Sequence, residues 1–243
     1  MKVTYLYHSG FLVEWENCCF LFDYIRGDLP QQAMQKPFFV FCSHSHGDHF
    51  TPEIFAKFRS KPDTCFVLAR QIDLRPSRLD KWGLPDWQRE KIFRIKAGES
   101  LQCADPKGES LEISTLASTD LGVAFLVRYE GKCLYHAGDL NDWQWKGEPE
   151  EWNRNMRKRF LTQMKKLQGL PIDLAFVPLD PRQEEMAPCG LNALLTTARV
   201  EKVLPMHMWD RYEIGAWWKK EGGLPDQADK LLEIQREGQQ FTL

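Results

Sequence analysis

Three histidines and an aspartate fall within six residues of the chain, in the stretch His44-Ser45-His46-Gly47-Asp48-His49. The stretch directly follows the apolar run Phe38-Phe39-Val40-Phe41, which has the composition of a buried strand. A tight turn at the end of a strand can bring these side chains into one small volume, as a divalent metal requires. Imidazole and carboxylate ligands favour zinc, iron or manganese over calcium or magnesium. Because the chain has only six histidines, the cluster predicts a metal site rather than a solvated polar loop.

Three other segments repeat the pattern of an apolar strand followed by a polar side chain. They lead into Asp23, into His136-Ala137-Gly138-Asp139 and into His207. Ligands that arrive from several strand ends are typical of a site supported by a rigid sheet. We therefore expect these segments to meet the histidine-rich turn.

The elements that position these side chains can be predicted from the periodicity of the chain. Short apolar runs bounded by turn residues predict strands over residues 2–7, 11–15, 18–23, 38–42, 64–69, 91–95, 111–116, 123–129, 132–136, 173–178 and 202–205. Helix signals predict helices over residues 51–60, 148–168, 192–200 and 226–236. The longest helix carries an apolar stripe that is expected to face the core, made of Trp152, Met156, Phe160, Met164 and Leu167.

The composition is that of a folded protein with a large core, because 43% of the residues are hydrophobic and 12% are aromatic. The chain shows no repeat, low-complexity tract or linker, so residues 1–243 are predicted to form a single domain. A formal net charge of -2 provides no basic field for a polyanion, so nucleic acid is not an expected partner.

The cysteines and the apolar runs indicate a cytoplasmic protein. Seven scattered cysteines with no Cys-x-x-Cys spacing are expected to be reduced thiols. No signal peptide is recognisable, and no run approaches the roughly 20 apolar residues of a membrane span, so no membrane association is expected. The sequence carries no signal of the oligomeric state.

Taken together, these motifs resemble the metallo-β-lactamase superfamily, whose signature is a His-x-His-x-Asp-His run. The likeness extends from Tyr7-His8-Ser9-Gly10, through Tyr135-His136-Ala137-Gly138-Asp139, to Pro205-Met206-His207. It is greatest to the cytosolic branch that contains the L-ascorbate-6-phosphate lactonase-like and other metal-dependent hydrolases. The resemblance implies an α/β fold of the four-layer αββα type, with two mixed sheets face to face and helices outside.

The resemblance also implies a site for two divalent metal ions, zinc in the first place, with manganese or iron as alternatives. Its first site would use His44 and His46. Its second site would use Asp48, His49 and His207, and Asp139 would bridge the two. Asp23 would orient the histidine cluster without binding metal.

One segment departs from the family pattern. The family supplies a further histidine before the strand that precedes the bridging aspartate, whereas residues 116–122 contain none. Asp120 is the best local substitute as a ligand; the alternative is that it caps a turn beside Gly122. The two remaining histidines, His8 and His136, are expected near the cleft, where they orient ligands or complete the first site.

Two metals would make hydroxide from water at neutral pH and polarise a carbonyl or phosphoryl oxygen. Asp48 is then expected to orient the attacking water, and His136 is a candidate for protonating the leaving group. The substrate is expected to be a small ester, lactone or phosphoester. Candidate substrate-binding residues are the aromatic side chains and arginines near the ligands, namely Trp143, Trp145, Trp209, Arg182 and Arg211.

Two other functions are compatible with these motifs. An incomplete first site could leave one iron held by two histidines and one carboxylate, which is the ligand set of a mononuclear iron dioxygenase. Alternatively, the chain could be a non-catalytic metal-binding sensor. A nuclease is disfavoured because no basic arm is visible in the sequence.

Overall fold

The computed structural model describes all residues from 1 to 243, and its strands form two mixed sheets. The first sheet has the order β13-β1-β2-β3-β4-β5-β6. Its strands are β1 (Lys2–Tyr7), β2 (Gly10–Glu14), β3 (Cys19–Phe22), β4 (Phe38–Cys42), β5 (Thr64–Ala69), β6 (Ile92–Ile95) and β13 (Gln240–Thr242). Strands β3 to β6 run parallel to one another, whereas β13, β1, β2 and β3 pair antiparallel.

The second sheet has the order β12-β11-β10-β9-β8-β7. Its strands are β7 (Ser100–Ala104), β8 (Ser110–Ala117), β9 (Val123–Tyr129), β10 (Lys132–His136), β11 (Pro171–Pro178) and β12 (Arg199–Met206). Strands β7 to β10 form an antiparallel meander, and β10, β11 and β12 are parallel.

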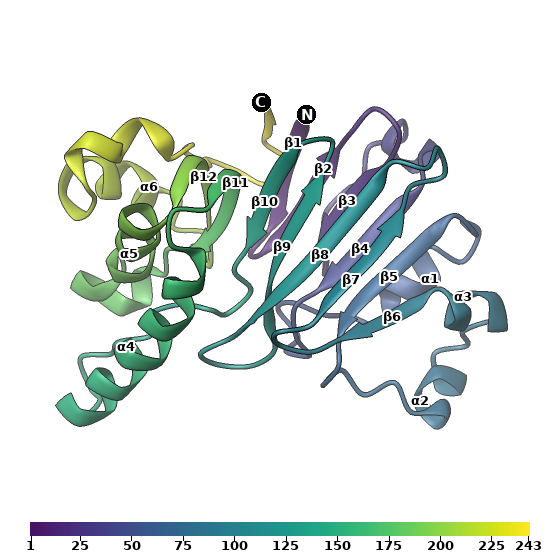
Figure 1. The fold of residues 1–243 in the computed structure, drawn as a ribbon, viewed down its shortest axis with the longest axis horizontal. Helices are drawn as coiled ribbons and strands as arrows, with labels where there is room; N and C mark the ends of the chain where they lie inside the picture. Colours follow the sequence, from purple (N-terminus) through teal and green to yellow (C-terminus); the bar gives the residue numbers. More distant parts are fainter.

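Helices cover the outer faces of both sheets, as Figure 1 shows. Helices α1 (Glu53–Lys57), α2 (Pro76–Lys81) and α3 (Asp86–Glu90) lie on the side of the first sheet, and α4 (Glu150–Met164), α5 (Cys189–Thr197) and α6 (Glu213–Trp217) on the side of the second. Short 3-10 segments and one π-helical turn add Ala33–Gln35, Lys165–Leu167, Pro181–Met186, Trp218–Gly222 and Pro225–Lys230. This arrangement confirms the predicted αββα sandwich. None of the helices combines the length and apolar composition needed to span a bilayer.

The continuous apolar runs of β3 and β4 follow from burial on both faces. Phe20 and Phe22 of β3 belong to the core cluster between the sheets, while Cys19 and Leu21 belong to the cluster under the outer helices. Strand β4 alternates in the same way. Since both faces of a central strand are covered, polar residues appear only where the strand ends.

The predicted strands are all present, with boundaries that differ by a few residues. Strands β7 and β13 were not predicted, because β7 is half exposed and alternates polar residues, and β13 is only three residues long. Helices α2, α3 and α6 were also missed. Each has only five or six residues, which is too short to establish a helical period.

Two predictions about helices were wrong. Residues 226–236 do not form a helix: after the 3-10 segment Pro225–Lys230, the chain extends beside β12, where Leu232 N–H donates to the carbonyl oxygen of Val203 at 2.8 Å. The backbone partner offered by the edge of the sheet outweighs the helical pattern there. Trp152 does not face the core either, since 37% of its surface is exposed.

Candidate metal centre

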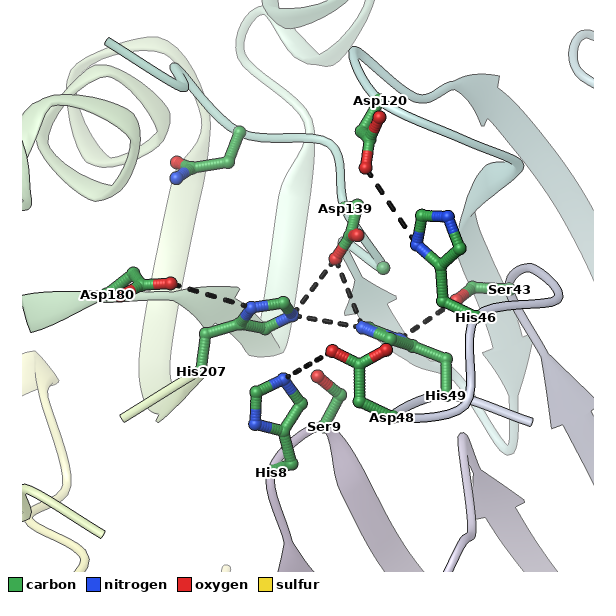
Figure 2. Close-up of polar contacts among 12 residues, drawn as sticks. His8, Ser9, Ser43, His46, Asp48, His49, Asp120, Asp139, Asp180 and His207 are labelled. Carbon is green, nitrogen blue, oxygen red and sulfur yellow. Dashed lines mark hydrogen bonds and ion pairs between the residues drawn. The ribbon is translucent and has the colours of Figure 1, made fainter. Parts of the chain in front are cut away.

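The residues expected to bind metal meet at the edge where strands of both sheets end (Figure 2). His44 to His49 follow β4, Asp139 lies three residues after β10, and His207 follows β12 directly. The carboxyl ends of parallel strands lie at the same edge of a sheet, and the two sheets pack with these edges together. Segments separated by more than a hundred residues in the sequence are therefore in contact here.

Asp139 lies at the centre of the cluster. Its Oδ1 is 2.9 Å from His207 Nε2 and 3.2 Å from His49 Nε2. Its Oδ2 is 3.2 Å from His44 Nε2. One carboxylate oxygen of Asp139 therefore faces His49 and His207, and the other faces His44.

The exposed side of the cluster contains His46 and Asp120. His46 Nδ1 is 3.1 Å from His44 Nε2 and 3.9 Å from Asp120 Oδ2. His46, Asp120 and Asp139 have ligand atoms within 4.8 Å of one another, and so do His44, His46 and Asp48. Asp120 is therefore close enough to His46 and Asp139 to share a metal ion with them.

A buried carboxylate below the cluster sets the tautomers of two imidazoles. Asp23 accepts hydrogen bonds from the backbone N–H of Ser43 at 2.7 Å, from Ser43 Oγ at 2.6 Å and from His49 Nδ1 at 2.7 Å. Ser43 Oγ in turn accepts from His44 Nδ1 at 3.0 Å. With Nδ1 of both rings used as a donor, the neutral forms of His44 and His49 turn an Nε2 lone pair toward Asp139.

This donor set fits a metal cation. His49 Nε2 and His207 Nε2 are 3.1 Å apart, and both lie beside Asp139 Oδ1, a buried atom that receives no well-directed hydrogen bond. Two lone pairs and a carboxylate oxygen that converge in this way repel one another unless a cation or a proton lies between them. Nitrogen and carboxylate donors in this arrangement match the ligand preference of zinc and related metals.

The pKa values describe a cluster that attracts positive charge. Burial by itself would raise the pKa of Asp139, but the imidazoles of His207, His44 and His49 hold it well below its usual range. Burial would lower the pKa of His49, yet the neighbouring carboxylates of Asp139 and Asp23 raise it to about 10. In the metal-free protein a proton on His49 therefore provides the positive charge.

Two glycines allow the turn after β4 to approach the second sheet. A Cβ on Gly122, whose φ is +79°, would lie 2.0 Å from the carbonyl oxygen of Ser43. A Cβ on Gly138, whose φ is +50°, would lie 2.8 Å from Ser43 Cβ. The same Ser43 carbonyl accepts a hydrogen bond from Val123 N–H at 3.0 Å, which joins the two sheets beside the ligands.

His8 lies closer to the ligands than expected for a residue that only orients them. Its ring is buried, and its Nε2 is 3.3 Å from Asp48 Oδ2. His8, His49 and His207 also offer ligand atoms within 4.8 Å of one another. Burial would raise the pKa of Asp48, but the neighbouring imidazoles of His8 and His49 lower it well below its usual range. Asp48 is thus an ionised carboxylate at the mouth of the cluster.

The proposed role of His136 in protonating a leaving group is wrong. Its ring is fully buried, with Nε2 2.9 Å from the carbonyl oxygen of Ser9 and Nδ1 accepting from Gly138 N–H at 3.2 Å. It also stacks on Phe22 with ring centroids 5.1 Å apart. Burial is the largest influence on its pKa, which is lowered, so the ring is a neutral structural link beneath the cluster.

Asp180 is a residue of the site that the sequence reasoning missed. It is fully buried after β11, and its Oδ2 lies 3.9 Å from His207 Nδ1, which has no hydrogen-bond partner. The same carboxylate accepts from Trp209 Nε1 at 3.1 Å. Its position two residues after a buried strand is the pattern that identified the other acids, so it could have been found.

A cavity of about 340 Å³ opens above the cluster. Its lining includes the predicted residues Trp143, Trp145, Arg182 and Trp209, together with the ligand candidates His46, Asp48, Asp120, Asp139 and His207. Trp152 and Met156, which the helical stripe assigns to the core, also line it. Arg211 does not: it lies in a separate depression and pairs with Glu213 at 3.3 Å.

Comparison with known proteins agrees with this geometry. Residues 2–148 match the beta-lactamase superfamily domain. A metal-dependent hydrolase of Opitutus terrae is 31% identical over 154 residues, which cover 57% of this chain and 63% of that protein. Another from Nitratidesulfovibrio vulgaris is 26% identical over 231 residues, covering 88% of this chain and 82% of that protein.

A solved structure gives the same fold over the whole chain. A metallo hydrolase from Ignicoccus hospitalis superposes with a TM-score of 0.60 at 19% identity, covering 100% of this chain and 98% of that one. The match over residues 2–148 includes the histidine-rich turn, Asp139 and more than half of the chain. The protein belongs to the beta-lactamase superfamily.

Proposed function

We propose that the protein is a metal-dependent hydrolase that holds two divalent ions, zinc in the first place, and acts on a small ester, lactone or phosphoester. The observation that carries the proposal is the convergence of His49 Nε2 and His207 Nε2 on Asp139 Oδ1, which has no well-directed hydrogen bond. The names of the two metal-dependent hydrolases that the chain resembles support the same reaction class.

When bound in such a site, divalent ions supply an electrophile and lower the pKa of bound water to about 7. Asp139 would hold the two ions together, since its oxygens face different imidazoles. Asp23 and Ser43 keep His44 and His49 in the tautomer that offers Nε2. Asp48, ionised and at the edge of the cavity, accepts a hydrogen bond from water and orients it toward the substrate.

The first test is elemental analysis of the protein purified without added metal, followed by hydrolysis assays on lactones, carboxylic esters and phosphoesters. We expect two zinc or manganese ions per chain, and turnover that disappears with a chelator and returns with zinc. Asp139→Asn should lose both ions, because the amide nitrogen cannot bridge them. One iron per chain with oxygen consumption would instead establish a dioxygenase, and bound metal without any turnover would establish a sensor.

We further propose that the protein acts in the cytoplasm. All seven cysteines are free thiols, and Cys18, Cys19, Cys42 and Cys133 are buried. Unpaired cysteines in this number are typical of a reducing compartment.

A further inference from the structure

The lining of the cavity above the cluster has two chemically different parts. One part consists of the imidazoles and carboxylates of the metal centre. The other part, which we call the aromatic wall, consists of Trp143, Trp145, Trp152, Met156 and Trp209. When the scissile bond of a substrate lies at the carboxylates of the metal centre, the group next to that bond must lie against indole rings.

Two of the four indoles, Trp143 and Trp209, offer this group carbon surface rather than a free N–H donor. Trp143 Nε1 already donates to the backbone carbonyl of Asp139 at 2.9 Å, and Trp209 Nε1 donates to Asp180 at 3.1 Å. The rings of Trp143 and Trp145 are nearly parallel, with an interplanar angle of 3° and centroids 6.0 Å apart. Because the protein itself holds the rings of Trp143, Trp145 and Trp209, this part of the wall is formed before any ligand binds.

The two most exposed indoles of the chain both line this cavity. Trp152 is 37% exposed and Trp209 is 38% exposed, and the one other exposed large apolar residue is the C-terminal Leu243. Water contact with two indoles costs free energy that a bound apolar group would recover. Apolar surface gathered at the rim of a concave site marks it as a binding surface.

Outside the metal cluster, the lining offers no unpaired cation to an anionic substituent. Arg182 is the one lysine or arginine in the lining, whereas Asp48 and Asp120 are acids at its mouth. The guanidinium of Arg182 is paired with the buried carboxylate of Asp180, with Nη2 to Oδ2 at 2.6 Å and Nε to Oδ1 at 3.0 Å. Its Cζ also lies 4.3 Å from the centroid of the Trp209 ring. The charge of Arg182 is thus already neutralised, and its flat face continues the aromatic wall.

From this geometry we infer that the substrate is a carboxylic ester or lactone with an uncharged, flat aromatic ring next to the scissile bond. The inference rests on the proposed hydrolase function and names the substrate class of the same cavity. In the reaction, the oxygen of water forms a bond to the acyl carbon, the acyl C–O bond breaks, and a proton from water passes to the leaving oxygen. A phosphorylated sugar bound with its reacting group at the metals would, by contrast, place its hydroxyl groups against indole carbon, beside one arginine that is already paired.

The experiment measures binding separately from turnover. Isothermal titration calorimetry on the zinc-loaded protein compares a naphthol, which is an uncharged flat ring, with glucose 6-phosphate, an anionic sugar. The variants are Trp152→Ala, Trp152→Phe and Trp217→Phe; Trp217 is the control because it lies in a separate depression. Hydrolysis of naphthyl acetate, the acetate ester of the same naphthol, gives KM and kcat for each protein.

We expect the naphthol to bind and glucose 6-phosphate to bind more weakly. Trp152→Ala should raise the Kd for the naphthol and the KM for naphthyl acetate about fivefold, as expected for loss of one aromatic contact, with kcat changed less than about twofold. Trp152→Phe keeps an aromatic ring and should raise both constants less than Trp152→Ala does, and the control Trp217→Phe should stay within about twofold of the unsubstituted protein.

Two results would overturn the inference: tighter binding of glucose 6-phosphate than of the naphthol, or a Kd for the naphthol that Trp152→Ala leaves unchanged. Either can occur while metal-dependent hydrolysis of other esters is observed, so the proposed function would stand. Conversely, binding of the naphthol that depends on Trp152, without hydrolysis of any ester, would refute the hydrolase and support the aromatic site.

Discussion

Replacing Asp23 by asparagine should release metal without removing a ligand. Asp23 is fully buried and accepts three hydrogen bonds, from Ser43 N, Ser43 Oγ and His49 Nδ1. Asparagine has the same shape, and its oxygen can still accept from the Ser43 backbone. Its amide group then stands where Oδ2 was, facing two donors instead of accepting from them. His49 must therefore move its proton to Nε2 or turn its ring, and in both cases Nε2 no longer offers a lone pair beside Asp139.

The size of the effect follows from these contacts. Two charge-assisted hydrogen bonds are lost, each of about 1.5–3 kcal/mol, so the free energy of unfolding of the metal-free protein should fall by roughly 3 kcal/mol or more. Loss of a partner that orients a metal-binding histidine typically weakens metal binding about 10–100-fold, or about 1.4–2.7 kcal/mol. The affinity of the ion beside His49 and His207 should fall by this factor.

Urea unfolding of the chelator-treated protein measures the first quantity, and competition with a zinc chelator of known affinity measures the second. Asp105→Asn is the matched control, because Asp105 is also a buried aspartate with several hydrogen bonds, from Tyr129 Oη at 2.7 Å and from the backbone N–H groups of Lys107 and Glu109. It lies in the turn between β7 and β8, outside the metal cluster. This control should lose stability and keep its zinc affinity.

The reasoning would be refuted if folded Asp23→Asn bound two zinc ions with unchanged affinity. It would also be refuted if Asp105→Asn lost zinc to the same extent, since general destabilisation would then explain both variants. Should Asp23→Asn fail to fold, Ser43→Ala provides the measurement. It removes the hydroxyl that accepts from His44 Nδ1 and should weaken the ion near His44 while leaving the Asp23 to His49 contact in place.

Three further outcomes are expected. His136→Gln should lower the free energy of unfolding by about 1–3 kcal/mol, because it disturbs the contacts with Ser9 and Gly138. The dependence of kcat/KM on pH should keep its shape in this variant. If the acidic or the basic side of that profile disappeared, His136 would have a catalytic role after all. Gly122→Ala should lower the free energy of unfolding, measured in urea, by more than about 3 kcal/mol, since its Cβ would lie 2.0 Å from the Ser43 carbonyl oxygen. A decrease below about 1 kcal/mol would contradict the close approach of this turn to the second sheet. The third outcome concerns pH. Burial lowers the pKa of His49, but Asp139 and Asp23 raise this pKa from 6.5 to about 10 in the metal-free protein. The protonated ring of His49 therefore stabilises the metal-free protein fully below about pH 6.5, and this stabilisation is lost as the pH rises toward about 10. Because zinc must displace this proton, the difference in Tm between zinc-loaded and chelator-treated protein, measured by calorimetry, should increase from about pH 6 to about pH 9. A difference in Tm that stays constant over this range would argue against a protonated His49.

The sequence alone predicted the elements whose signals are local and strong. The long strands could be predicted, because strands buried on both faces are continuous apolar runs with polar residues where they end; the αββα arrangement was implied by the resemblance to the metallo-β-lactamase superfamily. The same rule marked Asp23, the turn from His44 to His49, Asp139 and His207 as neighbours in space. Their chemistry depends on residue type, which can be read directly from the chain.

Tertiary structure decided the roles that depend on direction and depth. His136 precedes Asp139 by only three residues, yet its ring points into the core between the sheets, where no substrate reaches it. Trp152 fits a helical core stripe, but its turn of α4 lies over the cavity, so the ring lines the site. Asp180 comes to face His207 because β11 and β12 are paired in parallel.

The physical reason is that a sequence pattern fixes a side chain only relative to its own strand or helix. Whether that side chain meets a ligand, a hydrophobic core or open space depends on how distant elements pack. The tautomers of His44 and His49 show this most clearly, since both are set by Asp23, which is contributed by a different strand.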